Sequence, residues 1–421
     1  MPSVPNSPRV SVLMPSLNQA EFIEVAVRSV LQQSYPALEL LISDGVSSDG
    51  TLSVLERLSI EFGARLRWIS SADEGPAHAL NKALRSAQGD IIGWLNADDI
   101  YAPDAVSVAV QRFAAEAEMV MVYGEGEHVD GSGRTVGRYP TLAPAAGIES
   151  FQEGCFICQP TVFLRRRVFD EISGLNEELS TAFDFDLWLR LFLRFPGRIG
   201  YIERVQAFSR VHGRTITSLQ RKTVASEGIQ LLSRYLGRAN IHWILTYIDE
   251  ATRAYPVYDT SLDLREHVSA MLAELGPCFE AQELVRLRSL IEQDRRITDV
   301  PKGIHVDMFP DGWAGRELAV RIRSPLAGSF SLLLQCENRP ATTPLTLTIG
   351  TNCGTQTHLD VTRRGQFEIR IPFSDIALDQ LLFASVRSTV TFVPKLTERG
   401  SSDIRELSFH ISRVSLKSTH R

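Results

Sequence analysis

Residues 89–99 read GDIIGWLNADD, and this stretch decides the fold class. Its centre, residues 91–95, is a short apolar run of the kind found in strands buried on both faces of a parallel sheet. Two adjacent carboxylates, Asp98 and Asp99, follow where that strand ends. Negative charge concentrated there needs a cation or hydrogen-bond donors, and carboxylate oxygens suit Mg²⁺ or Mn²⁺ carrying a diphosphate. The alternative is that the pair only caps the helix that begins near Pro103.

Short apolar runs alternate with amphipathic stretches on both sides of this segment, from about residue 9 to residue 208. The apolar runs cover residues 10–14, 38–42, 66–69 and 91–95, and the stretches with helical spacing cover residues 22–31, 51–62 and 77–87. Strands that alternate with helices imply βαβ units, so the sequence predicts an α/β domain with a mostly parallel sheet. Polar clusters follow the strands, where open sheets of this kind bind ligands.

The rest of the chain has two other patterns. From about residue 215 to residue 297 the strand signal fades and apolar residues recur at helical spacing, which predicts a helical connector. After Pro301 the apolar period becomes two, with turn residues between the runs, which predicts an antiparallel β-sandwich. We therefore expect a flexible tail at residues 1–8, the α/β domain at 9–220, the connector at 221–300 and an accessory β-sandwich at 301–421.

The composition of the 421 residues is that of a globular protein, with 44% hydrophobic and 22% charged residues. The net charge of -6 argues against nucleic acid as the partner, because proteins that bind it carry a basic surplus. No apolar run approaches the ~18–20 residues of a membrane span, and the start, MPSVPNSP, lacks the features of a signal peptide. We therefore expect a cytoplasmic protein without a disulfide framework, in which Cys155 and Cys158 are buried in ordinary packing.

Three further polar clusters stand at strand or helix ends of the α/β domain. Asp44 opens the segment DGVSSDGT, and Asp73 opens DEGP before a helix. Taken singly, each is typical of a turn or a helix start. Asp184 lies between two phenylalanines at the start of an apolar helix, in FDFDLWLRL. That carboxylate could cap the helix or could be a general base in a partly desolvated pocket, and the residues alone leave both alternatives open.

Taken in order, the motifs of residues 9–220 resemble those of the family 2 glycosyltransferases of bacteria. The segments that carry the resemblance are VSVLMPSLNQAEFI, SDGVSSDGT, SADEGPAHALNKAL, GDIIGWLNADD, and FICQPTVFLRRRVFDEISGLNEEL followed by FDFDLWLRL. The resemblance implies a GT-A fold, which is Rossmann-like, and an inverting, metal-dependent transfer of a sugar from a nucleotide-diphosphate sugar to a hydroxyl. It also implies a glycan or lipid-linked glycan acceptor, in the synthesis of bacterial surface polysaccharide.

The resemblance gives roles to residues of the donor site. It implies that Asp44 hydrogen-bonds the nucleotide base and that Asp73 holds the base or the ribose. Pro15 and Asn18 are expected to line the same pocket. The donor is a nucleotide sugar, with a UDP-sugar favoured.

At the reacting end, the resemblance implies that Asp98 and Asp99 contact the ribose and a divalent cation, Mn²⁺ or Mg²⁺, that bridges the diphosphate. Asp184 is expected to deprotonate the acceptor hydroxyl. Arg210 and His212, in SRVHGRT, resemble a later motif whose residues approach the diphosphate or the metal. Because negative charge gathers on the departing diphosphate, a cation there stabilises the transition state more than the ground state.

Three positions depart from the family pattern. Asn96 replaces the first carboxylate of the DxD metal motif, so metal binding depends on Asp98 or Asp99. Leu17 stands where an aromatic side chain often stacks on the base, and His78 stands where an acidic residue is expected. The carboxylates on which metal binding then depends, Asp98 and Asp99, and the expected base, Asp184, are all present.

Two other functions compete with this one. A sugar nucleotidyltransferase would share the sheet and the cation but would carry a glycine-rich phosphate loop, which MPSLNQAEF lacks. A catalytically silent sugar- or nucleotide-binding protein would not need both Asp98 and Asp184. By family analogy, we expect the protein in the cytoplasm, with peripheral association at the inner face of the cytoplasmic membrane.

Overall fold

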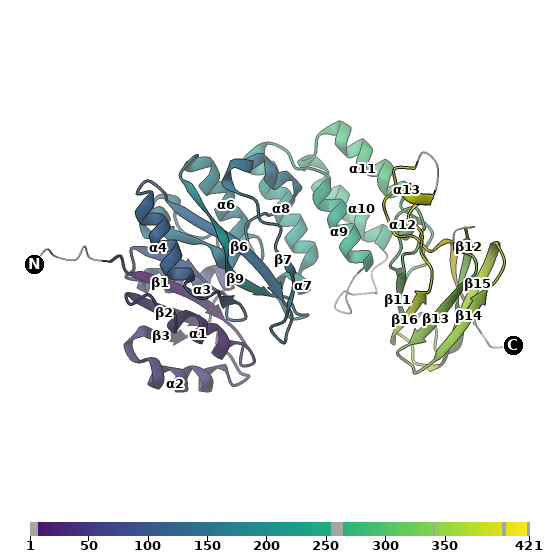
Figure 1. The fold of residues 1–421 in the computed structure, drawn as a ribbon, viewed down its shortest axis with the longest axis horizontal. Helices are drawn as coiled ribbons and strands as arrows, with labels where there is room; N and C mark the ends of the chain where they lie inside the picture. The colour runs from purple at the N-terminus through teal and green to yellow at the C-terminus, as the bar shows by residue number, and fades with distance from the viewer. Residues whose placement is uncertain (1–6, 254–263, 340–341, 398–400, 419–421) are drawn as a thin grey trace, which may run out of the picture. The chain divides into compact units, whose positions relative to one another are not determined.

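The structure is a computed structural model and describes residues 7–253, 264–339, 342–397 and 401–418 of the chain. The chain divides into two compact units, Met1–Ala239 and Asn240–Arg421, which Figure 1 draws in purple to teal and in green to yellow. The division falls inside residues 221–300, the stretch predicted to be a connector, so the helices of that stretch belong to two different units. The predicted flexible tail, residues 1–8, lies outside the described residues except for Ser7 and Pro8.

In the described part of the N-terminal unit, the strands form one nine-stranded sheet in the order β3-β2-β1-β4-β8-β6-β9-β5, with β7 paired to β6. The strands are β1 (Val10–Ser16), β2 (Leu38–Asp44), β3 (Leu66–Ser70), β4 (Ile91–Trp94), β5 (Ile100–Tyr101), β6 (Met121–Val129), β7 (Thr135–Arg138), β8 (Phe163–Arg165) and β9 (Ile199–Arg210). Strands β1 to β4 run parallel, and the predicted α/β fold class is confirmed.

The other half of this sheet is mixed. Strand β8 is antiparallel to both β4 and β6, whereas β9 is parallel to β6. A parallel neighbour needs a long crossover, usually a helix, but an antiparallel strand does not. The segment before β8 contains short 3₁₀ turns in place of a crossover helix, which accounts for the change of direction.

Helices cover both faces of the sheet (Figure 1). They are α1 (Ile23–Leu31), α2 (Thr51–Phe62), α3 (Pro76–Ser86), α4 (Ala105–Ala115), α5 (Arg166–Ile172), α6 (Phe183–Arg194), α7 (Ile216–Leu219) and α8 (Arg221–Leu236). Helices α1, α2 and α4 share a hydrophobic core with one face of the sheet. On the other face, Leu80 of α3, Phe169 of α5 and Trp188 of α6 surround Leu13.

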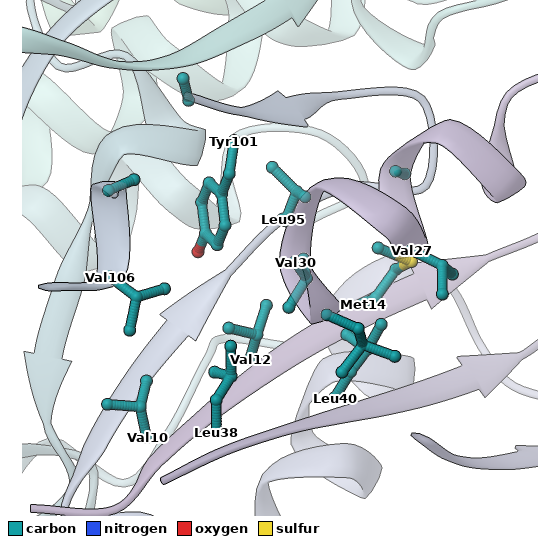
Figure 2. Packing of buried hydrophobic residues seen from close by; sticks show 14 of the residues in the cluster. Val10, Val12, Met14, Val27, Val30, Leu38, Leu40, Leu95, Tyr101 and Val106 are labelled. Atoms are coloured by element: carbon teal, nitrogen blue, oxygen red, sulfur yellow. The ribbon is translucent and has the colours of Figure 1, made fainter. Parts of the chain in front are cut away.

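Strand β1 illustrates why some apolar residues pack on one face of the sheet and others pack on the opposite face. Successive side chains of a strand point to opposite faces of the sheet. Val12 and Met14 therefore join the core formed with Val27 and Val30 of α1, as Figure 2 shows, while Leu13 faces the other side. A shift of one residue would exchange the two sets, so the apolar pattern fixes the register of β1.

The register places the ends of the parallel strands at one edge of the sheet. Ser16 at the end of β1 pairs with Asp44 at the end of β2, and Asp44 pairs with Ser70 at the end of β3. The loops that follow these strands are therefore neighbours, although they lie far apart in the sequence.

The C-terminal unit combines helices with two antiparallel sheets. The helices are α9 (His242–Arg253), α10 (Leu264–Leu275), α11 (Ala281–Gln293), α12 (Arg295–Thr298) and α13 (Pro394–Thr397). The described strands form two sheets, β10-β11-β16-β13-β14 and β15-β12-β17. Their bounds are β10 (Ile304–Val306), β11 (Glu317–Arg323), β12 (Gly328–Asn338), β13 (Leu345–Thr351), β14 (Gln356–Val361), β15 (Gly365–Ile376), β16 (Leu381–Ser388) and β17 (Phe409–Ser418). One hydrophobic core joins the two sheets, for example through Leu347 and Leu332, so the predicted β-sandwich is confirmed.

Two smaller expectations can be compared with the fold. All five cysteines lie among the described residues and are free thiols; Cys158 is buried and Cys155 is partly buried. A helix that spans a bilayer needs ~20 mostly apolar residues, and the described helices include none of this kind.

Candidate active site

Two loops at the carboxyl ends of β1 and β2 form the first wall of the candidate site. Hydrogen bonds join them: Asn18 N–H donates to Ser47 Oγ at 2.7 Å, and Ser48 N–H donates to Asn18 Oδ1 at 2.8 Å. Pro15 lies inside β1, three residues before Asn18. Asn18 therefore holds the two loops together through its backbone N–H and its side-chain oxygen.

Asp44 lies behind these loops, and its carboxylate is already satisfied within the protein. The residue is fully buried at the end of β2. Its Oδ1 accepts hydrogen bonds from Ser47 Oγ at 2.5 Å and from Ser16 Oγ at 3.3 Å. Its Oδ2 accepts from Ser47 N–H at 2.9 Å and from Ser70 Oγ at 2.8 Å. A carboxylate has about four acceptor sites, so a base could bind Asp44 only after one serine had turned away.

Asp73 is the more accessible carboxylate at this edge. It is partly exposed, and Gly75 N–H donates to its Oδ1 at 3.1 Å. Its other oxygen, Oδ2, lies so close to Gly45 that a Cβ at that glycine would be only 2.9 Å away. The glycine after Asp44 therefore lets Asp73 lie directly against the loop that follows β2.

Val46, in the loop after β2, has a strained backbone. Its φ is 67°, and a left-handed conformation costs an ordinary L-residue about 1–2 kcal/mol because Cβ crowds the carbonyl oxygen. Such strain is often found in loops held in place for function. The side chain is 56% exposed, and Leu17, after β1, is 54% exposed. Two aliphatic side chains thus stand exposed in loops at the same edge of the sheet.

We expect Val46→Gly to raise the melting temperature, because glycine adopts a positive φ without steric cost. The gain in unfolding free energy is at most about 1.5 kcal/mol once the larger entropy loss of glycine is subtracted. Val25→Gly is the matched control, since Val25 is 48% exposed on helix α1, where glycine should be destabilising. Calorimetry of both variants checks this, and a Val46→Gly protein that melts below the wild type contradicts the strain.

Asn96 and Asp99, after β4, are held by hydrogen bonds within the protein. Asn96 Oδ1 accepts from Trp94 Nε1 at 3.0 Å, and the Asn96 amide donates to Asp99 Oδ2 at 3.2 Å. Asp99 is 3% exposed, and its Oδ1 accepts from Arg210 N–H at 2.8 Å. Burial, together with the charge of the neighbouring Asp98, raises the pKa of Asp99 well above its usual range. In this geometry Asp99 joins the end of β9 to the end of β4.

Asp98 and His212 lie in contact with each other after the ends of β4 and β9. His212 Nε2 lies 3.1 Å from Asp98 Oδ2, and the two side chains are 12% and 15% exposed. The imidazole packs on the ring of Phe22 at a centroid distance of 4.9 Å. Two residues predicted for the reacting end therefore form a contact across 114 positions of the sequence.

Arg210 lies beneath this pair. The side chain is buried, its Nε donates to the carbonyl oxygen of Asp98 at 2.9 Å, and its Nη1 donates to the carbonyls of Asp130 and Gly131. The guanidinium also lies over the ring of Phe22, 4.8 Å from its centre. These contacts make Arg210 a support for the backbone that carries Asp98.

The Asp98–His212 pair can be tested against the expected cation. Among the described residues, no three His, Cys, Asp or Glu side chains converge to form a complete metal site. Two adjacent ligands, each about 2.1 Å from an octahedral cation, are about 3 Å apart. The pair is 3.1 Å apart, which is compatible with shared coordination. A mixed carboxylate and imidazole set suits Mn²⁺ better than Mg²⁺. The residues therefore fit a cation that takes its other ligands from a diphosphate.

Asp184 lies in the first turn of α6, whose N-cap residue is Ala182. The N–H of Phe185 donates to Asp184 Oδ1 at 2.7 Å. Burial raises the pKa of Asp184 to about 6, and the negative charge of Glu227 contributes to the rise. A carboxylate with a pKa close to neutral is suited to general base catalysis.

An aromatic contact joins this turn to the strand that leads to Asp98. The ring of Phe183, next to Asp184, stacks on Trp94 at the end of β4, with centroids 5.5 Å apart and an interplanar angle of 20°. The candidate base and the Asp98–His212 pair are therefore built on two elements in direct contact.

Several neighbours of these residues were not singled out from the sequence. Gln159 donates from Nε2 to the Trp94 carbonyl at 2.9 Å and accepts from the Asn96 amide at 3.0 Å. Its only signal was its place inside the quoted segment FICQPT. Glu227 lies on α8, outside every motif, so no local pattern marked it.

A hollow of about 270 Å³ opens beside the segment that precedes α6. Its lining includes Glu74 and Pro76 at the start of α3, Glu177 and Ser180 before α6, and Ile216 of α7. Small-molecule sites begin at about 300 Å³, so the size approaches that of a single ligand subsite. Carboxylate and hydroxyl groups on its wall suit a hydroxylated ligand.

Open α/β sheets form a class of domain that binds ligands at the carboxyl ends of the strands, and this sheet has its acidic and polar side chains there. Residues 11–173 match the model of the family described as Glycosyl transferase family 2. The chain is similar to the chondroitin synthase of Escherichia coli, with 29% identity over 236 residues, which cover 56% of this chain and 33% of that protein. It is also 31% identical to the hyaluronan synthase of Pasteurella multocida over 186 residues, covering 44% and 19% of the two chains. A solved structure of S. aureus TarS 1–349 in complex with UDP is similar at 16% identity and a TM-score of 0.45, covering 67% of this chain and 87% of that one.

The residues that match this family model lie within the N-terminal unit. The chain spans about a third of the length of the E. coli relative and about a fifth of the P. multocida relative. The similarity to both proteins concerns part of their length.

Proposed function

We propose that the N-terminal unit transfers a sugar from a nucleotide-diphosphate sugar to a hydroxyl group, with inversion at the anomeric carbon. The observation that carries this proposal is the position of Asp184 in the first turn of α6, joined by the Phe183–Trp94 stack to the strand that leads to Asp98. A single displacement requires a base on the acceptor side and charge compensation on the leaving-group side. Asp184 supplies the first, and the Asp98–His212 pair is suited to the second.

Asp184 accepts the proton of the acceptor hydroxyl while the oxygen of that hydroxyl attacks the anomeric carbon. The new carbon–oxygen bond forms on the face opposite the departing diphosphate, so the configuration inverts and no covalent enzyme intermediate forms. A carboxylate with a pKa of about 6 is ionised at neutral pH. It is also a stronger base than an ordinary aspartate, which favours proton transfer.

Asp73 and the joined loops after β1 and β2 hold the nucleoside. Asp73 is the accessible hydrogen-bond acceptor for the base or the ribose. Leu17 and Val46 offer aliphatic surface to the base in place of an aromatic ring. Asp44 fixes the serines beneath the pocket, and the family resemblance favours a UDP-sugar.

Asp98 and His212 would hold the divalent cation, and their donor atoms favour Mn²⁺. When bound, the cation neutralises negative charge on the leaving diphosphate. Arg210 keeps Asp98 in position through its bond to the Asp98 carbonyl. Asp99, which is buried, supports the same strand end.

The acceptor that we propose is a hydroxyl of a glycan or lipid-linked glycan in polysaccharide synthesis. The names of two relatives, chondroitin synthase and hyaluronan synthase, support this class of acceptor. The hollow lined by Glu177 and Ser180 is a suitable place for it, because Ser180 lies four residues before Asp184.

The test is release of nucleoside diphosphate from a panel of UDP- and GDP-sugars, with and without Mn²⁺ and a mixture of oligosaccharide acceptors. We expect at least one donor to give release that increases with acceptor. Donor binding without any release would instead identify a silent binding protein. Formation of a nucleotide sugar from a sugar phosphate and a nucleoside triphosphate would identify the nucleotidyltransferase.

A further inference from the structure

The turn that leads into α6 is held by a residue of another helix. The N-cap residue of α6 is Ala182, and no side chain caps the helix. Glu227 of α8 instead accepts hydrogen bonds from the three residues before the helix. Its Oε2 accepts from Thr181 N–H at 2.9 Å, from Thr181 Oγ1 at 2.7 Å and from Ala182 N–H at 2.8 Å. Its Oε1 accepts from Ser180 N–H at 2.8 Å.

We propose that Glu227 is the positioning residue for Asp184, and that its carboxylate fixes the turn at residues 180–182 so that the base faces the acceptor. This inference rests on the proposed function, in which Asp184 is the base. Four donors converge on one carboxylate, and hydrogen bonds to a charged group are about twice as strong as neutral ones. Asp184 follows Ala182 by two residues, so a displaced turn displaces the base. A displacement of about 1 Å can cost about 10²-fold in rate.

The body of α6 is anchored independently of Glu227. Phe183 stacks on Trp94, and Asp186 accepts a hydrogen bond from Tyr235 Oη of α8 at 2.8 Å. Because neither contact involves Glu227, we expect its carboxylate to control the turn more than the fold of the helix.

Glu227 also acts on Asp184 through its charge. Among the described residues, the ionisable groups that interact electrostatically with Asp184 are Glu227, the thiol of Cys155 and the phenol of Tyr139. Burial raises the pKa of Cys155 to about 12 and that of Tyr139 well above its usual range, so both groups are neutral near pH 7. Glu227 is therefore the charged neighbour, and removing its charge should lower the pKa of Asp184.

The experiment compares Glu227→Gln, Glu227→Asp and a control, Glu178→Gln, in the full chain. Glu178 is an exposed acidic residue in the same segment before α6. Two properties are measured: hydrogen exchange of the amides of residues 180–182, and the pH dependence of hydrolysis of the UDP-sugar selected by the donor panel, with water as acceptor. Glutamine has the shape of glutamate, but only one of its two terminal groups can accept a hydrogen bond.

For Glu227→Gln we expect faster exchange at residues 180–182 and a kcat lower by about 10–100-fold, with the KM for the donor nearly unchanged. The acid limb of its pH profile should move to lower pH. Glu227→Asp keeps the charge but not the reach, so kcat should fall while the acid limb stays in place. Glu178→Gln should match the wild type in both measurements.

Wild-type exchange at residues 180–182, or a wild-type kcat and acid limb in Glu227→Gln, would overturn the inference. If Glu227→Gln does not fold, Glu227→Asp carries the test, and a wild-type kcat and exchange in that variant would overturn it. Asp184→Asn separates this inference from the proposed function. If transfer survives in Asp184→Asn, Asp184 is not the base and the proposed function is wrong. If Asp184→Asn loses transfer while the Glu227 variants behave like the wild type, only the positioning role of Glu227 is wrong.

Discussion

Asp184→Asn is expected to lower sugar transfer by about 10²–10⁴-fold, the usual contribution of a general base. Asparagine keeps the size of the side chain and an acceptor for the N–H of Phe185, but its amide cannot take the proton of a hydroxyl. The affinity for the donor should be nearly unchanged, because Asp184 acts on the acceptor side. Initial rates of acceptor-dependent transfer and calorimetric titration with the donor measure the two properties.

The same variant should be more stable than the wild type above pH 6. Burial raises the pKa of Asp184 to about 6, so the folded protein binds this proton more tightly than the unfolded chain does. The stabilisation that comes from the protonated carboxyl is complete below the unfolded pKa of about 4 and is lost as the pH rises through the folded pKa. The asparagine variant stays neutral, so its advantage in unfolding free energy should grow with pH to about 1–3 kcal/mol.

Asp186→Asn is the matched control and should behave in the opposite way. Asp186 is 1% exposed and accepts hydrogen bonds at 2.8 Å from both Arg190 and Tyr235. Its replacement should lower the unfolding free energy by about 1–3 kcal/mol and leave kcat nearly unchanged at temperatures where the protein is folded. Near-normal transfer by Asp184→Asn would contradict the assignment of the base.

Asp98→Ala is expected to lower turnover by about 100-fold or more, because the leaving diphosphate loses a ligand of its cation. The fold should be nearly unaffected, since the Asp98 side chain is partly exposed and its partner is His212. His212→Ala should show the same loss. Electron paramagnetic resonance of Mn²⁺ with UDP provides a readout that does not depend on turnover, and both variants should bind the ion more weakly than the wild type.

Asp99→Ala tests whether Asp99 has a structural role, in contrast to the cation-binding role proposed for Asp98 and His212. Asp99 is buried and accepts the N–H of Arg210, so the substitution should lower the unfolding free energy by about 1–3 kcal/mol. Full activity of Asp98→Ala in the presence of a strong chelator would contradict the cation site.

The elements of the first half of the sheet could be predicted from the sequence. Strands β1 and β2 are continuous apolar runs, and α1 has apolar residues at clear helical spacing, so burial and local structure favour the same assignment. The mixed half could not be predicted in the same way. Strand β8 has only three residues, Phe163–Arg165, which is too short to carry a period, and its direction depends on packing between distant segments.

The candidate site was predictable only in part. The motifs identified Asp98, His212 and Asp184 as candidates. They did not show which carboxylate oxygens already accept hydrogen bonds from other residues of the protein. The saturation of Asp44 depends on three serines from three different segments, which only the register of the sheet brings together. Glu227 reaches Ser180 across 47 positions, and such a contact leaves no local pattern in the sequence.

The anomeric configuration of the transferred sugar is the measurement that tests the central claim most directly. Proton NMR of the first product, made from an α-linked UDP-sugar by the full chain, reports both that transfer occurred and which configuration resulted. Attack by a hydroxyl activated by Asp184, opposite the departing diphosphate, predicts a β-linked product together with one released UDP per sugar transferred. An α-linked product, or no product from any donor of the panel, would contradict the account.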